Sequence, residues 1–505
     1  MVTFIRIFVF FNGIMRKKVT KAFLSLLVAP CVMNAQQYED KQAEEKTVKQ
    51  EDSADKPQLT ISGEASIHAN IGDPDYTYFD KNPTEAEKRS KDTGMSRVAI
   101  GDHSLVFKGS GKLQNGVKYA VIFDLEAMDG NVEADKMYIQ FSHDRWGTLQ
   151  IGDVKGPEKK CVYSGQQLLG GTCGLDGTLP SEFDFATGVI SPLYNVGNTS
   201  KATKIAYYSP RVCGFQLGIA LTPDTKLHGQ TNKDRHAGSA STGNDNGLFT
   251  KAGGSQKPSG RNNIALALTH VHEFQNGITT KLSAVYVTES TKRVKTSSYG
   301  YVDVSTADES KITGNGVVEN EYTKEVKLHN ASAFLLSATI DYKKWSIGVG
   351  YVDNGKSRTP KNEEELVNKK VVGPGEGVDA GVEAGTTRYY YVGNFLGTGK
   401  SNAGKAWNIG AQYRFNDKLT FSGVFHHMKR KVHTNNHTKG NAITIAADYK
   451  ICDGLMVFAE FNHISTKSCD LACYMYNSCF KDTKERNAIK KQNAQLFVVG
   501  AKVSF

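Results

Sequence analysis

The residues of this chain that could do chemistry are first of all its cysteines. Three of the eight fall within residues 469–479. A structural metal site needs thiolates and imidazoles at short, regular spacing, and no histidine stands at ligand spacing among these three. We therefore expect loop disulfides here and no metal. The three cysteines are Cys469, Cys473 and Cys479.

The histidines and glycines do not predict a catalytic site. His426, His427, His433 and His437 gather near one predicted loop, where surface histidines are commoner than metal ligands. Residues 397–399, Gly-Thr-Gly, precede no predicted helix, whereas a phosphate-binding glycine loop needs one. We expect no enzymatic activity and no cofactor.

The elements that position these residues follow a period-two alternation, which is clearest over residues 493–505. Apolar side chains occupy every second position, and Lys502 lies on the opposite face. This pattern predicts a β-strand with one apolar face. It fits either an edge strand of a soluble domain or the closing strand of a membrane barrel. The apolar positions are Phe497, Val499, Ala501, Val503 and Phe505.

The same alternation recurs along the chain and predicts an all-β, transmembrane antiparallel β-barrel of sixteen strands. Tight connections alternate with mostly long ones, as in barrels with short periplasmic turns and long outer loops. An even strand number puts both chain ends on one side. The predicted strands are 59–69, 102–113, 117–128, 135–142, 148–154, 201–208, 215–222, 262–271, 278–288, 331–342, 345–352, 404–415, 419–429, 441–450, 455–466 and the closing segment 493–505.

The two faces of the strands predict which side meets lipid. In strand 404–415 the apolar Trp407 and Ile409 alternate with the polar Asn408 and Gln412. Sixteen strands enclose more space than inward side chains can fill, so the interior should hold water. Aromatic residues at strand ends predict a girdle at the membrane interface. These are Trp146, Tyr207, Tyr342, Trp345, Phe415, Phe421 and Tyr449.

The start of the chain predicts export. Residues 1–35 carry a basic cluster, an apolar run and a small residue at Ala35, which is the pattern of a signal peptide, with Met15 as an alternative start. Pro30 argues against a lipoprotein at Cys31. Residues 36–58 are almost all polar and predict a solvated periplasmic tether, and 59–505 the barrel. Export together with a transmembrane barrel predicts a location in the outer membrane of a Gram-negative bacterium.

Three segments resemble the sixteen-stranded general porins of Gram-negative bacteria. They are Trp146-Gly-Thr-Leu-Gln-Ile-Gly152, the run from Lys204-Ile-Ala-Tyr-Tyr to Phe215, and the closing strand that ends in Phe505. The resemblance implies a homotrimer and a third loop folded into the lumen. It also implies that the barrel-assembly machinery reads Phe505 as an assembly signal.

The resemblance further implies a charged constriction, in which acidic loop residues face a basic wall and filter ions. The third loop would be 155–199, and Gly152-Asp153 departs from the family's Gly-Arg. We hypothesise that Cys161 and Cys173 pair and stiffen this loop. The acidic candidates are Asp176, Glu182 and Asp184, and the basic candidates are Lys108, Lys118, Lys136 and Lys204.

The favoured function is passive diffusion of small hydrophilic solutes and ions through a water-filled channel. One alternative is a substrate-selective or anion-selective porin, since the net charge is +10. Another is a surface-exposed structural or adhesive barrel with a largely closed lumen, and a third is a secreted β-domain with an enzyme site. The basic run Lys429-Arg430-Lys431 favours contact with outer-membrane lipid and lipopolysaccharide over nucleic acid.

Overall fold

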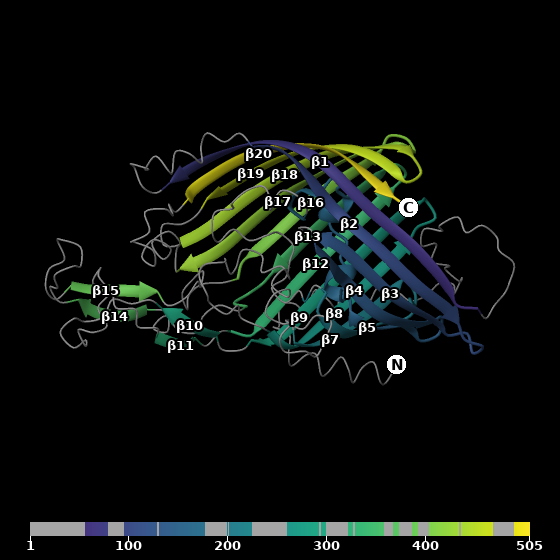
Figure 1. The fold of residues 1–505 in the computed structure, drawn as a ribbon, viewed down its shortest axis with the longest axis horizontal. Helices are drawn as coiled ribbons and strands as arrows, with labels where there is room; N and C mark the ends of the chain where they lie inside the picture. Colours follow the sequence, from purple (N-terminus) through teal and green to yellow (C-terminus); the bar gives the residue numbers. More distant parts are fainter. Residues whose placement is uncertain are drawn as a thin grey trace. The chain divides into compact units, whose positions relative to one another are not determined.

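The first and last strands of the main sheet pair with each other. β1 (Gln58–Tyr78) runs antiparallel to β20 (Ile489–Ser504), with Ala65 opposite Val503 and Ile71 opposite Phe497. This pairing closes the sheet into a barrel and removes both of its edges (Figure 1). The computed structural model describes residues 56–78, 95–128, 131–176, 199, 201–224, 260–291, 294–298, 322–326, 329–357, 367–372, 386–391, 403–433, 436–467 and 489–505.

The barrel contains the sixteen predicted strands in their predicted order, and each pairs with its neighbours in an antiparallel sense. The predicted fold is therefore confirmed. Between β1 and β20 the strands are β2 (Met95–Lys112), β3 (Lys118–Met128), β4 (Asn131–His143), β5 (Gly147–Asp153), β6 (Thr203–Tyr208), β7 (Phe215–Asp224), β8 (Gly260–Glu273), β9 (Ile278–Thr291), β12 (Ala331–Tyr342), β13 (Trp345–Asp353), β16 (Lys405–Arg414), β17 (Leu419–His433), β18 (Asn436–Cys452) and β19 (Leu455–Lys467).

Several strands run further toward the long loops than the alternation predicted. β1 continues to Tyr78, and β2 already begins at Met95, although the polar and glycine residues there interrupt the apolar period. Two hairpins were also not predicted, because their strands are short and polar. They are β10 (Val294–Ser298) with β11 (Tyr322–Val326), and β14 (Val367–Val372) with β15 (Thr386–Tyr391).

The apolar outer face follows the predicted alternation. On β20, Phe497 and Val499 are 47% and 42% exposed, whereas Leu496 and Val498 are fully buried inside. Large apolar side chains are thus exposed on the face that meets lipid. Near the tight turns the Tyr207 hydroxyl donates a hydrogen bond to the Trp146 carbonyl at 2.8 Å. The other predicted girdle residues, Trp146, Tyr342, Trp345, Phe415, Phe421 and Tyr449, are exposed.

The inner face is less uniformly polar than the sequence indicated. Lys502 lies on the inner face as predicted and forms an ion pair with Glu64 across the closing seam, with Nζ–Oε1 2.5 Å. Apolar inward side chains such as Val285 and Leu335 pack in one cluster with Cys161 and Val162 of the segment after β5. Part of the inner wall is therefore covered by protein rather than by water.

In the part of the chain that the structure describes, no helix is long and apolar enough to span a membrane. The expected signal peptide and residues 36–55 of the expected tether lie outside the described residues. Residues 56 and 57 lead directly into β1, which begins at Gln58.

Candidate functional site

Residues 155–202 connect β5 to β6, and we call them the inward loop. Its described part contains α4 (Pro157–Lys160) and two short 3₁₀ turns, η1 (Gly165–Leu168) and η2 (Gly174–Asp176). Pro157 suits the first turn of α4 because a helix start needs no N–H from that residue. Ser164 and Gln167 cap η1 reciprocally, and the Ser164 N–H donates to Gln167 Oε1 at 2.9 Å. Local chemistry thus gives the loop a compact path.

Short polar side chains of the inner wall hold the inward loop along six strands, from β9 to β19. Most of them accept a backbone N–H of the loop, and each such hydrogen bond contributes about 0.5–1.5 kcal/mol. The contacts are Ser283 Oγ to Cys161 O, Tyr163 N to Ser337 Oγ (2.8 Å), Gly165 N to Asn408 Oδ1 (3.1 Å), Gly170 N to Ser422 Oγ (2.9 Å), Gly171 N to Asp448 Oδ1 (2.9 Å) and Thr172 N to Glu460 Oε2 (2.7 Å).

Three glycines allow the loop backbone to touch the wall backbone. Gly165 crosses directly over Gly348 of β13 and Gly410 of β16. A Cβ at Gly165 would lie 2.2 Å from the Gly410 nitrogen, and a Cβ at Gly348 would lie 2.8 Å from the Gly165 nitrogen. Only residues without a side chain permit this approach. The wall is therefore shaped to receive the loop at this crossing.

Two buried carboxylates bind the tip of the described loop. Glu460 Oε1 accepts hydrogen bonds from the Thr172 hydroxyl at 2.9 Å and from Asn462 Nδ2 at 2.7 Å, in addition to the Thr172 N–H on its other oxygen. Asp448 receives the Gly171 N–H. Neither residue was identified from the sequence, although the alternation along their strands places both on the inward face.

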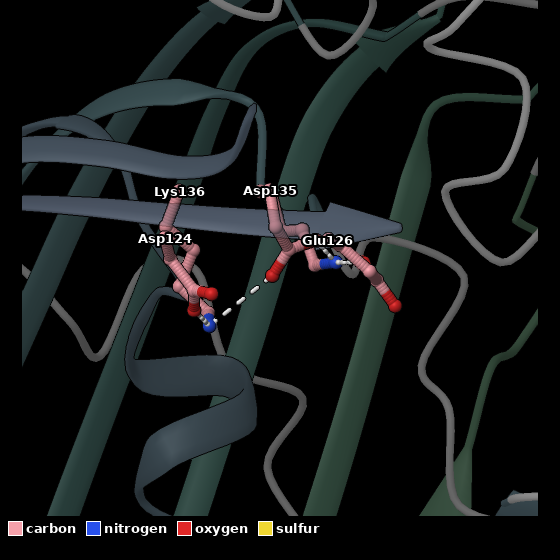
Figure 2. Close-up of polar contacts among 5 residues, drawn as sticks. Asp124, Glu126, Asp135 and Lys136 are labelled. Carbon is pink, nitrogen blue, oxygen red and sulfur yellow. Dashed lines mark hydrogen bonds and ion pairs between the residues drawn. The ribbon is translucent and has the colours of Figure 1, made fainter. Parts of the chain in front are cut away.

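The return end of the loop enters an ion-pair cluster on β3 and β4. Figure 2 shows Asp124 and Glu126 beside Asp135 and Lys136. Lys201 of the loop pairs with Asp135 and, at 3.2 Å, with Glu126. A β-bulge between β3 and β4 explains why the adjacent Asp135 and Lys136 both reach this cluster. The loop is thus fixed to the wall at both ends.

The four basic candidates do not share one environment. Lys108 and Lys204 lie on one cross-strand row, through Ile122, Tyr138 and Gly152. Lys108 is exposed on the inner face, but Lys204 is 1% exposed and donates to the Val154 carbonyl.

The other two basic candidates are placed differently again. Lys136 pairs with Asp124 and Asp135, and Lys118 lies exposed beside a tight turn. Of the four candidates, Lys108 alone is exposed at mid-height on the wall.

The acidic side of the expected constriction is only partly described. Asp176 ends η2 close to β18, and Glu182 and Asp184 lie outside the described residues. A basic residue that the sequence did not indicate, Lys160 of α4, reaches back to β5, where its Nζ donates to Gln150 Oε1 at 2.6 Å. It also lies over the Tyr138 and Tyr208 rings.

The hypothesised disulfide is not formed in this structure. Neither cysteine forms a disulfide; Cys161 is buried and Cys173 is exposed. The loop carries them to different wall strands, since Cys161 contacts β9 and Thr172 contacts β19. Their placement argues against the expected pairing.

The two thiols should react differently with a water-soluble maleimide at pH 8. Burial, and then the Glu158 carboxylate, raise the pKa of the Cys161 thiol to about 12, so it stays protonated and unreactive. We expect labelling at Cys173 and none at Cys161, measured by mass spectrometry of peptides from the folded protein. Peptides joined by a Cys161–Cys173 bond would contradict this result.

Comparison with known proteins decides the family. The sequence matches the Gram-negative porin family over residues 22–371 and 375–468, which include the inward loop and most of the barrel. This chain belongs to the Gram-negative porin family. Members of this family are outer-membrane channel proteins and not enzymes. Porins of this family are typically trimeric.

The porin also resembles individual proteins more weakly. An uncharacterized protein of Rickettsia felis is 27% identical over 253 residues, which are 44% of this chain and 54% of that protein. One of Rickettsia conorii is 26% identical over 262 residues, which are 46% and 55%. The chain spans about half the length of the curated relatives it matches.

Two solved structures are similar to most of the porin. The trimer form of OmpT, an outer membrane protein of Vibrio cholerae, is 10% identical with a TM-score of 0.46, and the match covers 89% of this chain and all of that one. An anion-selective porin from Comamonas acidovorans is 10% identical with a TM-score of 0.44, and the match covers the same shares.

Proposed function

We propose that this porin conducts small hydrophilic solutes and ions by passive diffusion, and that the inward loop sets the size limit. One observation carries the proposal: a closed barrel of sixteen strands holds a loop inside it, bonded to the inner face of six of those strands. Because its hydrogen bonds hold it against the wall, this loop would narrow the lumen of a wide barrel permanently. Solutes would be sorted by size and by charge at the narrowed level.

The charges that would filter ions in this proposal are Lys108 and Lys160. Both are exposed, while Lys136 and Lys204 are engaged with wall groups. This arrangement supports a mild preference for anions. The assembly that we propose is a homotrimer, in which part of the exposed apolar outer face would pack against neighbouring subunits.

A second candidate function is a structural or adhesive barrel with a closed lumen. It is favoured by inward side chains that are less than 2% exposed, which include Leu335, Ile464 and Leu496. Such burial means that protein covers these parts of the inner wall. The two functions predict opposite results in one experiment.

The test is single-channel recording in a planar lipid bilayer. Purified folded porin should give steps in groups of three, with weak ion preference in salts of different ion size. Saturation by one solute would indicate a substrate-selective porin instead. A folded barrel, verified by heat-dependent gel mobility, that conducts nothing would rule out both channel proposals.

The ion preference should fall as pH rises from 7 to 9. Burial in the narrow lumen, and then the nearby Lys204 charge, lower the pKa of Lys160 to about 8, although its side chain keeps contact with the lumen. Below that pKa the ammonium is charged, so it is about 90% cationic at pH 7 and about 10% at pH 9. We expect the anion-to-cation permeability ratio, measured from reversal potentials, to decline over this range.

Substitution separates Lys160 from other titrating groups. K160R keeps its charge throughout, because arginine is not deprotonated in proteins, so its ratio should stay high and flat. K160M should be low and flat. A wild-type decline that persists in both variants would assign the effect to another residue.

A further inference from the structure

Five lysines from five adjacent strands form one row on the outside of the barrel. The cross-strand register places Lys405 opposite Lys429, Lys429 opposite Lys439, Lys439 opposite Lys467, and Lys467 opposite Lys491. All five are exposed, and their neighbours along the strands, such as Ala406, Met428 and Thr438, are buried on the inner face. We call this set the lysine row. It lies toward the ends of β16 to β20 that are opposite the tight turns.

The middle of the lysine row faces no carboxylate on the described lengths of its own strands. Over the lengths that the structure describes, the outward positions of β16 to β20 contain no aspartate or glutamate. Asp353 of the neighbouring β13 pairs with Lys405 at one end of the row, with Nζ–Oδ2 2.7 Å. Like charges directly opposite each other on neighbouring strands destabilise a sheet. With strands about 4.8 Å apart, the three middle members of the row, Lys429, Lys439 and Lys467, concentrate positive charge that an external counter-charge would balance.

The position of the lysine row along the strands indicates which layer of the membrane it contacts. Two residues nearer the barrel middle, the next outward row contains Trp407, His427 and Asn441. Trp407 is 40% exposed and contacts the rings of Phe425 and His427. Tryptophan of this kind marks the boundary between lipid chains and headgroups. The lysine row lies about 7 Å beyond it, and lysine stems can extend their ammonium groups further outward.

We propose that the lysine row is a binding surface for the phosphate groups of anionic lipid headgroups in the leaflet around the long-loop side of the barrel. Phosphate supplies the negative charge that the strands lack, and adjacent ammonium groups can share it. Each lysine near an anionic membrane surface adds to the attraction, so three such residues together produce a strong local enrichment. This surface lies outside the channel and is independent of what the channel conducts.

The test uses Trp407 as a local reporter. Trp146 and Trp345, the other tryptophans of the chain, lie at the opposite ends of the strands and are replaced by phenylalanine. The full-length barrel is refolded into phosphatidylcholine vesicles that contain either brominated phosphatidylglycerol or brominated phosphatidylcholine. Quenching of Trp407 by each lipid at equal mole fraction then gives the local lipid preference. We expect about fivefold or greater enrichment of the anionic lipid at low salt, and loss of most of it at 1 M salt.

The decisive variant is K429Q/K439Q/K467Q, which should bring the lipid preference close to one. The matched control, K112Q/K343Q/K418Q, removes three exposed lysines at the tight-turn ends and should keep the wild-type preference. Heat-dependent gel mobility verifies that each variant is folded. Equal quenching by the two lipids in the wild type, or an equal loss in the control, would overturn the proposal. If neither lipid quenched Trp407, this face would be covered by a neighbouring subunit, and the proposal would also be overturned.

Discussion

Replacing Gly165 by valine should make the open channel noisy and lower its mean conductance. A Cβ at this position would lie 2.2 Å from the nitrogen of Gly410 and 2.8 Å from its Cα. These are backbone atoms of β16, which is paired with β13 on one side and β17 on the other. The wall cannot yield without breaking two ladders, so the loop must move instead.

The direction of that movement determines the effect on current. The barrel wall blocks any outward movement, and the displaced segment can only enter the lumen. Overpacking of this kind costs about 1–3 kcal/mol or more, and about 1.4 kcal/mol changes a population ratio tenfold. The detached state should therefore be well populated. A fluctuating obstruction in the lumen increases current noise and reduces mean conductance.

Gly109 provides the matched control. It lies on β2, and a Cβ there would meet nothing within 4 Å, so G109V should conduct like the wild type. Planar-bilayer recording of both variants, with gel mobility as the test of folding, separates loop displacement from general damage. A steady current of wild-type size from folded G165V would show that the loop does not limit conduction.

The barrel was predictable because each strand has its own evidence in the sequence. The alternation around Trp407 and Ile409 requires no knowledge of neighbouring strands, and tight turns such as residues 114–116 define where strands end. The seam between β1 and β20 followed from closure alone. Strand ends were less predictable, because glycine and aspartate near Gly72 and Asp73 interrupt the period while backbone pairing continues.

The candidate site was predictable only in part, because it depends on contacts between distant residues. Inward parity identified Lys108 correctly as an inner-face residue, but parity cannot reveal that the Val154 carbonyl accepts from a buried Lys204. Glu460 acquires its role from Thr172, 288 residues away in the sequence. The lysine row shows the same limitation, since its members span residues 405–491 and become neighbours only through the register.

Removing Phe505 should reduce assembly in the outer membrane far more than it reduces the stability of the folded barrel. The structure limits its energetic role to the seam: the Phe505 N–H donates to the Gly63 carbonyl at 3.0 Å, and the Gly63 N–H donates back at 2.9 Å. The ring is 72% exposed on the outer face. Deletion therefore costs about 1–3 kcal/mol for two hydrogen bonds. The rest of the seam, from Glu64 opposite Ser504 onward, remains.

An assembly signal and a structural contact give different results in two assays. If the assembly machinery reads the ring, F505A should accumulate poorly in the outer membrane although it keeps both backbone hydrogen bonds. The same variant should refold in detergent and show normal conductance. F497A is the matched control, because Phe497 is another exposed outward aromatic residue on β20, and it should assemble normally. Equal cellular yields of F505A and F497A would show that Phe505 acts only as a strand end.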